Sequence, residues 1–419
     1  MAVTGSDTLV ARATHVWGPA VRPAAATDGV AGRMPRVVLE PADATELAAM
    51  LQWSDAEGLA IVPRGAGTKL DWTPPPPRVD AVLSTARLNA PLEHCAGDLT
   101  ATIPSGASIA AVNRLLKREA QWLPLDPAYA GRATIGGIVA ANDSGPRRQR
   151  YGTPRDLIIG VEMALTSGRV ARAGGRVVKN VAGYDLSRLL CGSFGTLAVI
   201  TRATFKLAPV PAISRTVVSS LQDARQLSDL ALAVVSGPLT PTAVELETPP
   251  LRLLVRFETT LRAAEEQAMR ALELCERHGK GAAIVDEAAE ADLWQQHDSR
   301  IWRTDQTVLK VSVLPARVGV LLEQVGAALG ARKIEWQAAG RAALGVTLIA
   351  LCGSPDQHAA AVDELRTTTV GLGGTAVGLT TATEVGVSLA SWGGAGDALG
   401  LMREVKSRFD PHGTLRNGI

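Results

Sequence analysis

"AIVPRGAGTKLDWTPPPP", residues 60–77, runs from a short apolar segment into a loop with two glycines and ends in four prolines. The apolar segment predicts a buried strand. Gly65 and Gly67 follow it directly, and glycine can take a positive φ and has no side chain to keep an anion from the backbone N–H groups. This loop is therefore either a phosphate-binding turn, assisted by Arg64 or the Thr68 hydroxyl, or an ordinary turn after a strand.

The same stretch excludes the two common nucleotide-binding loops. A P-loop needs the pattern GxxxxGK[ST], which is absent, and a Rossmann fingerprint needs a glycine where Leu70 stands. The prolines at 74–77 also prevent the helix that follows a Rossmann loop. Any phosphate site here must therefore be a nest of backbone amides formed by a turn.

A second stretch, "LDPAYAGRATIGGIVAANDSGPRRQRYG" at residues 125–152, is dense in small residues and contains the adjacent Gly136 and Gly137. Small side chains allow the backbone to approach a flat ligand closely and leave a slot for it. They would equally allow a helix to pack closely against a sheet. This stretch alone leaves both interpretations open.

A third stretch, "GGRVVKNVAGYDLSRLLCGSFGTLAVIT" at residues 174–201, again places glycines before an apolar strand. Gly192 and Gly195 could supply turns only. Four polar residues of this stretch are typical of a loop locked by hydrogen bonds, and they are Lys179, Asn180, Tyr184 and Asp185. Three separate glycine-rich loops are nevertheless more than chance turns readily explain.

Outside these loops, the chain predicts mixed α and β structure. Residues 43–58 are typical of an amphipathic helix, with Asp43 or Thr45 as its cap. A later β-rich stretch predicts a hairpin that turns at Ser167 and Gly168. Helices and strands thus alternate with no internal repeat.

Prolines at 209–211 predict a domain boundary. We therefore expect a first domain over residues 1–211 and, over residues 212–390, an α+β second domain in which strands alternate with helices rich in alanine and leucine. The remaining residues, 391–419, predict one more helix that ends before Pro411, followed by a short tail.

Composition narrows the class of protein. Of the 419 residues 46% are hydrophobic and 20% charged, and the net charge of +2 leaves no electrostatic footprint for nucleic acid. The four cysteines stand far apart, which indicates neither a disulfide framework nor an iron–sulfur site and fits a reducing cytoplasm. No stretch reaches the roughly 18 apolar residues that span a bilayer, and the first residues lack the apolar core of a signal peptide. We expect a cytoplasmic protein without direct membrane insertion, and any contact with the inner membrane would be through a complex.

Taken together and in this order, the three glycine-rich stretches resemble the FAD-binding domain shared by vanillyl-alcohol oxidase and p-cresol methylhydroxylase. The similarity covers about residues 30–211 and returns in "FDPHGTLRNG", residues 409–418. Within that family the chain is most similar to FAD-binding subunits of bacterial glycolate oxidase, a glycolate dehydrogenase that also has a second flavin subunit and an iron–sulfur subunit. The resemblance implies an α+β fold: a two-part FAD-binding domain of the p-cresol methylhydroxylase type, an α+β cap domain, and a C-terminal segment that returns to the FAD domain.

The resemblance also implies which residues bind FAD. The first loop would hold the diphosphate, the small-residue stretch would lie along the ribityl chain and isoalloxazine, and the third stretch would border the adenine. In that order the residues are Arg64, Gly65, Ala66, Gly67 and Thr68; Pro127, Thr134, Gly136, Gly137, Asn142, Ser144 and Gly145; and Gly195, Leu197 and Val199. Covalent members often carry histidine at the end of the first loop, where this chain has Thr68, so we expect non-covalent FAD.

Catalytic members of the family use a histidine-rich motif in the cap domain to bind a divalent metal and take the hydroxyl proton of a 2-hydroxy acid. The six histidines of this chain are scattered, and no two have the spacing that would start a metal site. We therefore expect no metal, assign no catalytic residue, and interpret each histidine as a surface or structural residue. They are His15, His94, His278, His297, His358 and His412.

Three functions follow from the resemblance. The first is an FAD-binding subunit of a glycolate or other 2-hydroxy acid dehydrogenase, which accepts electrons on FAD and passes them to an iron–sulfur partner. The second is a self-sufficient FAD oxidoreductase for another small hydroxy acid, whose carboxylate an arginine such as Arg300 or Arg303 would hold. The third is a non-catalytic assembly subunit that FAD stabilises.

Overall fold

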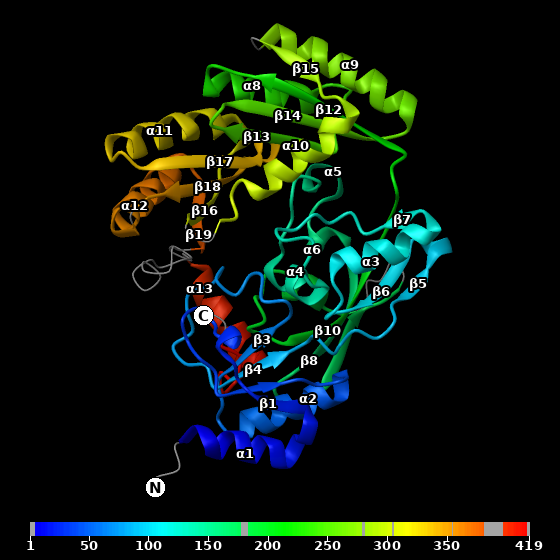
Figure 1. The fold of residues 1–419 in the computed structure, drawn as a ribbon, viewed down its shortest axis with the longest axis vertical. Helices are drawn as coiled ribbons and strands as arrows, with labels where there is room; N and C mark the ends of the chain where they lie inside the picture. Colours follow the sequence, from blue (N-terminus) through cyan, green and yellow to red (C-terminus); the bar gives the residue numbers. More distant parts are fainter. Residues whose placement is uncertain are drawn as a thin grey trace. The chain divides into compact units, whose positions relative to one another are not determined.

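The computed structural model describes the helices, strands and loops of most of the chain, namely residues 5–176, 183–278, 281–303, 306–353, 355–380 and 397–416. Of the polar residues singled out in the third stretch, Lys179 and Asn180 lie outside these ranges. Figure 1 shows the arrangement of the elements within each part of the chain.

The chain divides into two compact units. Unit 1 consists of Met1–Ser144, Thr153–Val210 and Gly394–Ile419, and unit 2 consists of Gly145–Gly152 and Pro211–Gly393. Residues 145–152, which we expected in the first domain, thus belong to unit 2.

Unit 1 contains two sheets (Figure 1). In the first, the strand order is β1-β2-β4-β3; β2, β4 and β3 run parallel, and β1 is antiparallel to β2. Helices α1 and α2 complete its core around Leu47, Met50 and Ile61. The elements are α1 (Gly5–Trp17), β1 (Val21–Pro23), β2 (Val37–Leu39), α2 (Ala44–Ala56), β3 (Ile61–Arg64) and β4 (Ala81–Ser84).

The helix predicted over residues 43–58 is confirmed as α2. Its cap is Asp43, whose carboxylate accepts the backbone N–H groups of Thr45 and Glu46. The helix ends at Ala56, two residues before Gly58, which takes a φ of +63°. The chain then turns directly into β3, so that the predicted strand leads into the glycine loop.

The second sheet of unit 1 is antiparallel, with strand order β5-β6-β10-β8-β9. The predicted hairpin is confirmed: β8 and β9 pair through a turn in which Gly168 has a φ of +79°. Around this sheet lie short helices and a two-stranded ribbon. The elements are β5 (Glu93–Cys95), β6 (Thr100–Pro104), α3 (Ile109–Leu116), β7 (Gln121–Trp122), α4 (Ile135–Ala141), α6 (Pro154–Leu157), β8 (Ile158–Ala164), β9 (Val170–Gly174), α7 (Leu186–Leu190), β10 (Val199–Lys206) and β11 (Ala208–Pro209).

The C-terminal segment packs within unit 1. Helix α13 (Ala398–Phe409) ends before Pro411, as predicted. The carboxylate of Asp410 accepts the backbone N–H groups of Thr414 and Leu415, and Leu415 forms a parallel bridge with Ile61 of β3. Because Leu415 is fully buried in the core of the first sheet, this tail supports the strand that carries the glycine loop.

Unit 2 is built on an eight-stranded antiparallel sheet, β15-β12-β14-β13-β17-β18-β16-β19. Its helices α8, α9, α11 and α12 form the main core on one face, whereas α10 packs on the other (Figure 1). The elements are α5 (Arg148–Tyr151), β12 (Ile213–Ser220), α8 (Ala224–Ser236), β13 (Ala243–Thr248), β14 (Arg252–Thr259), α9 (Leu261–His278), β15 (Ala282–Ile284), α10 (Glu287–Ser299), β16 (Thr307–Ser312), α11 (Val318–Ala331), β17 (Glu335–Arg341), β18 (Val346–Cys352), α12 (Pro355–Gly371) and β19 (Thr375–Thr380).

Alternation along β13 shows how the two faces of this sheet differ. Val244 and Leu246 point into the main core, whereas Glu245 and Glu247 point to the face that α10 covers. Helices and strands of both units together confirm the predicted α+β fold.

Candidate functional site

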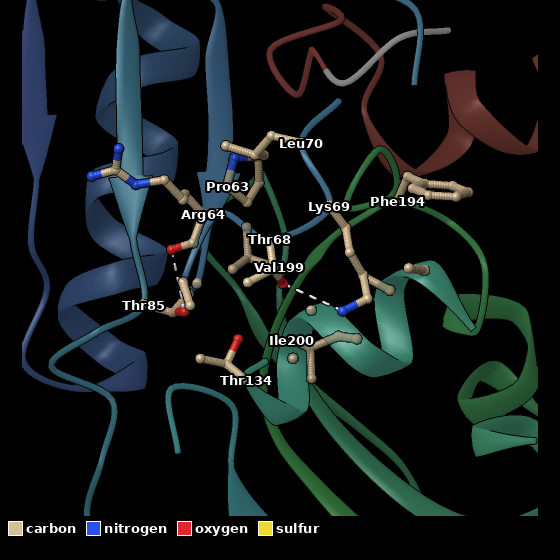
Figure 2. A pocket seen from close by; sticks show the side chains of 18 of the residues that line it. Pro63, Arg64, Thr68, Lys69, Leu70, Thr85, Thr134, Phe194, Val199 and Ile200 are labelled. Atoms are coloured by element: carbon tan, nitrogen blue, oxygen red, sulfur yellow. Dashed lines mark hydrogen bonds between the residues drawn. The ribbon is translucent and has the colours of Figure 1, made fainter. Parts of the chain in front are cut away.

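A pocket opens in unit 1 at the carboxyl end of β3 (Figure 2). Its wall combines the loop after β3, the start of α4 and the segment that leads into β10, and Thr85 joins it from the neighbouring parallel strand β4. The lining residues are Pro63, Arg64, Gly65, Ala66, Gly67, Thr68, Lys69, Leu70, Thr85, Thr134, Gly136, Gly137, Ala140, Ala141, Phe194, Gly195, Ala198, Val199 and Ile200.

The first loop needs its glycines because its backbone lies close to Thr134 and turns with a positive φ. A Cβ on Gly65 would lie 2.1 Å from the Thr134 hydroxyl oxygen, closer than any real contact. Gly67 has a φ of +74°, in the left-handed region that favours glycine. Thr85 fixes the start of the loop, because its backbone N–H donates to the Arg64 carbonyl at 2.8 Å. The loop is thus a tight glycine turn at the pocket wall, packed against Thr134.

The small-residue stretch allows close helix packing and also lines the pocket. A Cβ on Gly136 would lie 2.9 Å from Cβ of Ser105, so this glycine allows α4 to pack closely on the end of β6. A Cβ on Gly137 would instead lie 3.3 Å from the Thr134 hydroxyl, at the pocket. Close helix packing and the pocket wall therefore coincide at the first turn of α4.

The third stretch closes the pocket against the end of α4. The backbone N–H of Phe194 donates to the Ala140 carbonyl at 2.8 Å, and that of Gly192 donates to Val139 at 3.1 Å. Gly195, with a φ of +74°, then brings the chain past Pro63. Segments more than a hundred residues apart are thereby held around one space.

A second cavity of about 500 Å³ adjoins this pocket. It shares Gly65, Ala66 and Thr134 with the pocket and extends along the start of α3. A ligand that is longer than the first pocket can therefore continue past the glycine loop.

The structure brings most of the expected binding residues to this pocket. Those that line it are Arg64, Gly65, Ala66, Gly67, Thr68, Thr134, Gly136, Gly137, Gly195 and Val199. Those that do not line it are Pro127, Asn142, Ser144, Gly145 and Leu197.

Three of these non-lining residues have evident local roles. Asn142 caps α4 with a φ of +47°, and its side-chain oxygen accepts the backbone N–H of Arg155. Leu197 lies in the core of the second sheet. Gly145 belongs to unit 2, where its carbonyl accepts a hydrogen bond from Arg341 Nε.

Sequence reasoning missed several lining residues. They are Pro63, Lys69, Leu70, Thr85, Ala140, Ala141, Phe194, Ala198 and Ile200. Lys69 directly follows the glycine loop, and this position could have marked it as a lining residue. Thr85 carried none, because it reaches the pocket only through the pairing of β4 with β3.

The Arg64 side chain corrects one expectation. Its guanidinium does not assist in the pocket but pairs with Asp28, with 2.6 Å between Nη2 and Oδ1 (Figure 2 shows it turned away). Asp28 is 2% exposed and also accepts hydrogen bonds from Arg22 and from the Ala25 backbone. The Arg22 hydrogen bond is the main cause that holds the pKa of Asp28 well below its usual range, against the opposing effect of burial.

Replacing Asp28 with asparagine should lower the free energy of unfolding by about 1–3 kcal/mol, because two arginines lose their charged acceptor. A lowered pKa means that the carboxylate stabilises the fold above its ordinary pKa and that this contribution is lost as the pH falls. Urea unfolding at neutral pH and near pH 3 measures both effects. Asp98→Asn, at an exposed position, is the matched control, and equal midpoints for the two variants would contradict the prediction.

None of the helices in the described ranges is both long and apolar enough to cross a lipid bilayer. Within the same ranges, histidine, cysteine and carboxylate side chains form no group of three or more that could hold a metal ion.

Comparisons with known proteins agree with the pocket. Residues 35–174 match the family model described as "FAD binding domain". The chain is 33% identical over 222 residues to glycolate oxidase subunit GlcD of Bacillus subtilis, a match that covers 53% of this chain and 47% of that protein. It is 30% identical to D-2-hydroxyglutarate dehydrogenase of Xanthomonas citri pv. viticola, and this match covers 62% of this chain and 60% of that protein. It is 38% identical to glycolate oxidase subunit GlcE of Escherichia coli, and this match covers 32% of this chain and 39% of that protein.

A solved structure of alkyldihydroxyacetonephosphate synthase matches the fold, with a TM-score of 0.72 and 17% identity over 92% of this chain and 77% of that one. The chain spans about half the length of the curated relatives that it matches. A turn of small residues at the pocket wall, with Gly67 at positive φ, fits the diphosphate of FAD, which backbone N–H groups of such a turn can bind. Residues 35–174 therefore match an FAD-binding domain, and these comparisons support the expected resemblance, the α+β fold and FAD as the cofactor.

Proposed function

We propose that the chain is the FAD-binding subunit of a multi-subunit 2-hydroxy acid dehydrogenase of the glycolate oxidase type. The observation that carries this proposal is the glycine-lined pocket at the end of β3, in a chain whose relatives include two proteins named as glycolate oxidase subunits. Its partners would be a second flavin subunit and an iron–sulfur subunit, and its substrate a small 2-hydroxy acid.

In this proposal the chain binds FAD chiefly through its main chain. Backbone N–H groups of residues 65–68 hold the diphosphate, and the Thr134 hydroxyl stands between the two glycine-bearing segments to accept or donate a hydrogen bond. Gly195 and Val199 border the far side of the pocket. When bound, FAD supplies the capacity to accept two electrons and release them singly to iron–sulfur centres.

Side chains of unit 2 support a relay rather than a self-sufficient enzyme. Both ring nitrogens of His297 are within hydrogen-bond distance of carboxylates, at 2.8 Å from Glu247 and 3.1 Å from Glu245, so neither nitrogen is open to take a substrate proton. Arg300, a candidate for a substrate carboxylate, donates to the Pro249 carbonyl and lies 3.7 Å from Glu247. His297 and Arg300 thus bind partners within the fold, which leaves them engaged in structural contacts.

A spectroscopic experiment tests the proposal. We expect the chain, expressed alone and supplied with FAD, to be yellow and to release its flavin on acid precipitation, since the binding is non-covalent. Under anaerobic conditions glycolate should leave this absorbance unchanged, whereas the complex assembled with the two partner subunits should be bleached. Bleaching of the isolated chain by glycolate, D-lactate or D-2-hydroxyglutarate would instead establish a self-sufficient oxidoreductase. A colourless chain in a fully active complex would establish an assembly subunit.

A further inference from the structure

Lys69 is a buried cation in the wall of the flavin pocket. Its side chain is 6% exposed, and its ammonium lies 3.3 Å from the Thr68 hydroxyl, 3.2 Å from the Ala128 carbonyl and 3.3 Å from Oδ2 of Asp143. Figure 2 shows the ammonium reaching the Thr68 hydroxyl inside the pocket wall. Three acceptors thus surround the three N–H bonds of one ammonium group.

Asp143 holds this ammonium in place. Its carboxylate is 9% exposed and also accepts the backbone N–H of Ala128 at 2.9 Å. Lys69 donates to the carbonyl of the same residue, so the ion pair joins the glycine loop, the turn at residue 128 and the end of α4. The glycine loop and the end of α4 both line the pocket.

The pair has a definite electrical orientation. Its positive end lies beside Thr68, the last residue of the diphosphate loop, and its negative end lies at the Ala128 backbone. Among the described lining residues, Arg64 and Lys69 are the cationic ones, and the Arg64 guanidinium faces Asp28 instead. Burial lowers the pKa of Lys69, and the neighbouring carboxylate of Asp143 opposes that shift.

We propose that Lys69 determines the preference of this pocket for a flavin that carries a diphosphate, with Asp143 as its positioning residue. The inference rests on the proposed binding of FAD at this pocket. Backbone amides supply only partial charges to an anion, whereas a buried ammonium supplies a full charge in a medium of low dielectric. Riboflavin has the same ring system without phosphate and therefore gains nothing from that charge.

The test compares FAD with riboflavin on the purified apoprotein, with dissociation constants measured by titration of flavin fluorescence. The central variant is Lys69→Met/Asp143→Asn, which removes both charges and leaves no unpaired carboxylate. We expect it to bind FAD about 10- to 100-fold more weakly than the natural chain, because the diphosphate loses a full positive charge nearby in a medium of low dielectric. Riboflavin affinity should stay within about twofold.

Three other variants complete the set. Lys69→Met alone should weaken FAD binding further, because it leaves Asp143 charged and unpaired beside the diphosphate. Lys69→Arg should keep most of the preference for FAD. Lys117→Met, at an exposed position outside the pocket, removes one positive charge as Lys69→Met does, and it should change neither the FAD affinity nor the riboflavin affinity.

The outcomes separate this inference from the proposed function. A double variant that binds FAD as tightly as the natural chain, or that loses FAD and riboflavin equally, would show that the pair is only a structural clamp and would overturn the inference. A natural chain that binds no FAD would overturn the proposed cofactor site itself. If Lys69→Met fails to fold, the double variant still decides the question.

Discussion

We expect Gly65→Val to weaken FAD binding about 5- to 150-fold, since the overpacking, which costs about 1–3 kcal/mol, strains the loop that we assign to the diphosphate. Even the first carbon of the new side chain would lie 2.1 Å from the Thr134 hydroxyl oxygen and 3.2 Å from Thr134 Cβ. Thr134 cannot yield easily, because it begins α4 and its carbonyl accepts the backbone N–H of Ile138 at 2.9 Å. The loop must therefore move and give up its shape for a diphosphate.

A matched control and a relief variant sharpen this test. Gly97→Val adds the same side chain where nothing lies within 4 Å, so FAD affinity there should be unchanged. Gly65→Ala/Thr134→Ala removes the hydroxyl that the new carbon meets, and it should bind FAD better than Gly65→Ala alone. Titration of each apoprotein with FAD measures these affinities. Normal FAD binding by Gly65→Val would mean that the diphosphate lies elsewhere.

Features that depend on neighbouring residues could be predicted from the sequence. Gly67 does take positive φ, Asp43 does cap a helix, and Gly168 does turn a hairpin, because each needs only its own backbone and a few adjacent groups. The order of the three glycine-rich stretches indicated the resemblance to FAD-binding proteins, since all three stretches line one pocket. Local chemistry and motif order thus sufficed for the fold and for most of the pocket wall.

Contacts between distant segments could not be predicted in this way. Arg64 stands in the predicted loop, yet its charge is taken up by Asp28, which lies 36 positions earlier. The ion pair of Lys69 could not be predicted, because its partner Asp143 follows more than seventy positions later, at the end of another helix. Such pairs are set by the tertiary fold, and a single sequence without that fold offers no means to match them.

The histidine that we interpreted as structural, His297, lies in a buried cluster of charged groups in unit 2. It lies on α10, 5% exposed, between Glu245 and Glu247, which are each 1% exposed. Burial alone would lower the pKa of His297, but hydrogen bonds and attraction to the two carboxylates raise it to about 9. The pKa of Glu247 falls to about 2, against the effect of burial, because His297 and Arg252 stabilise its charge.

These shifts predict how the stability of unit 2 depends on pH. A histidine whose pKa rises from 6.5 to about 9 contributes fully below pH 6.5, and that contribution is lost as the pH rises through about 9. The expected loss is about 3 kcal/mol, at 1.36 kcal/mol for each unit of pKa. Glu247, with its pKa lowered from 4.5 to about 2, contributes above pH 4.5 and loses its contribution as the pH falls through about 2. Unit 2 should therefore be most stable between about pH 4.5 and 6.5.

Replacing His297 with glutamine should destabilise unit 2 by about 3–5 kcal/mol, since it leaves two buried carboxylates facing each other without the cation between them. Glu247 keeps Arg252 and Arg300, whereas the nearest arginine nitrogen to Glu245 is Arg341 Nε at 3.9 Å, so Glu245 should carry most of the cost. Glu245→Gln in the His297→Gln background should then recover part of the stability. Hydrogen exchange of the α10 backbone amides at pH 6 and pH 9 measures both effects, with His278→Gln, at an exposed position, as the control. If the natural chain and His297→Gln showed the same dependence on pH, the imidazolium between the two carboxylates would not be the group that titrates.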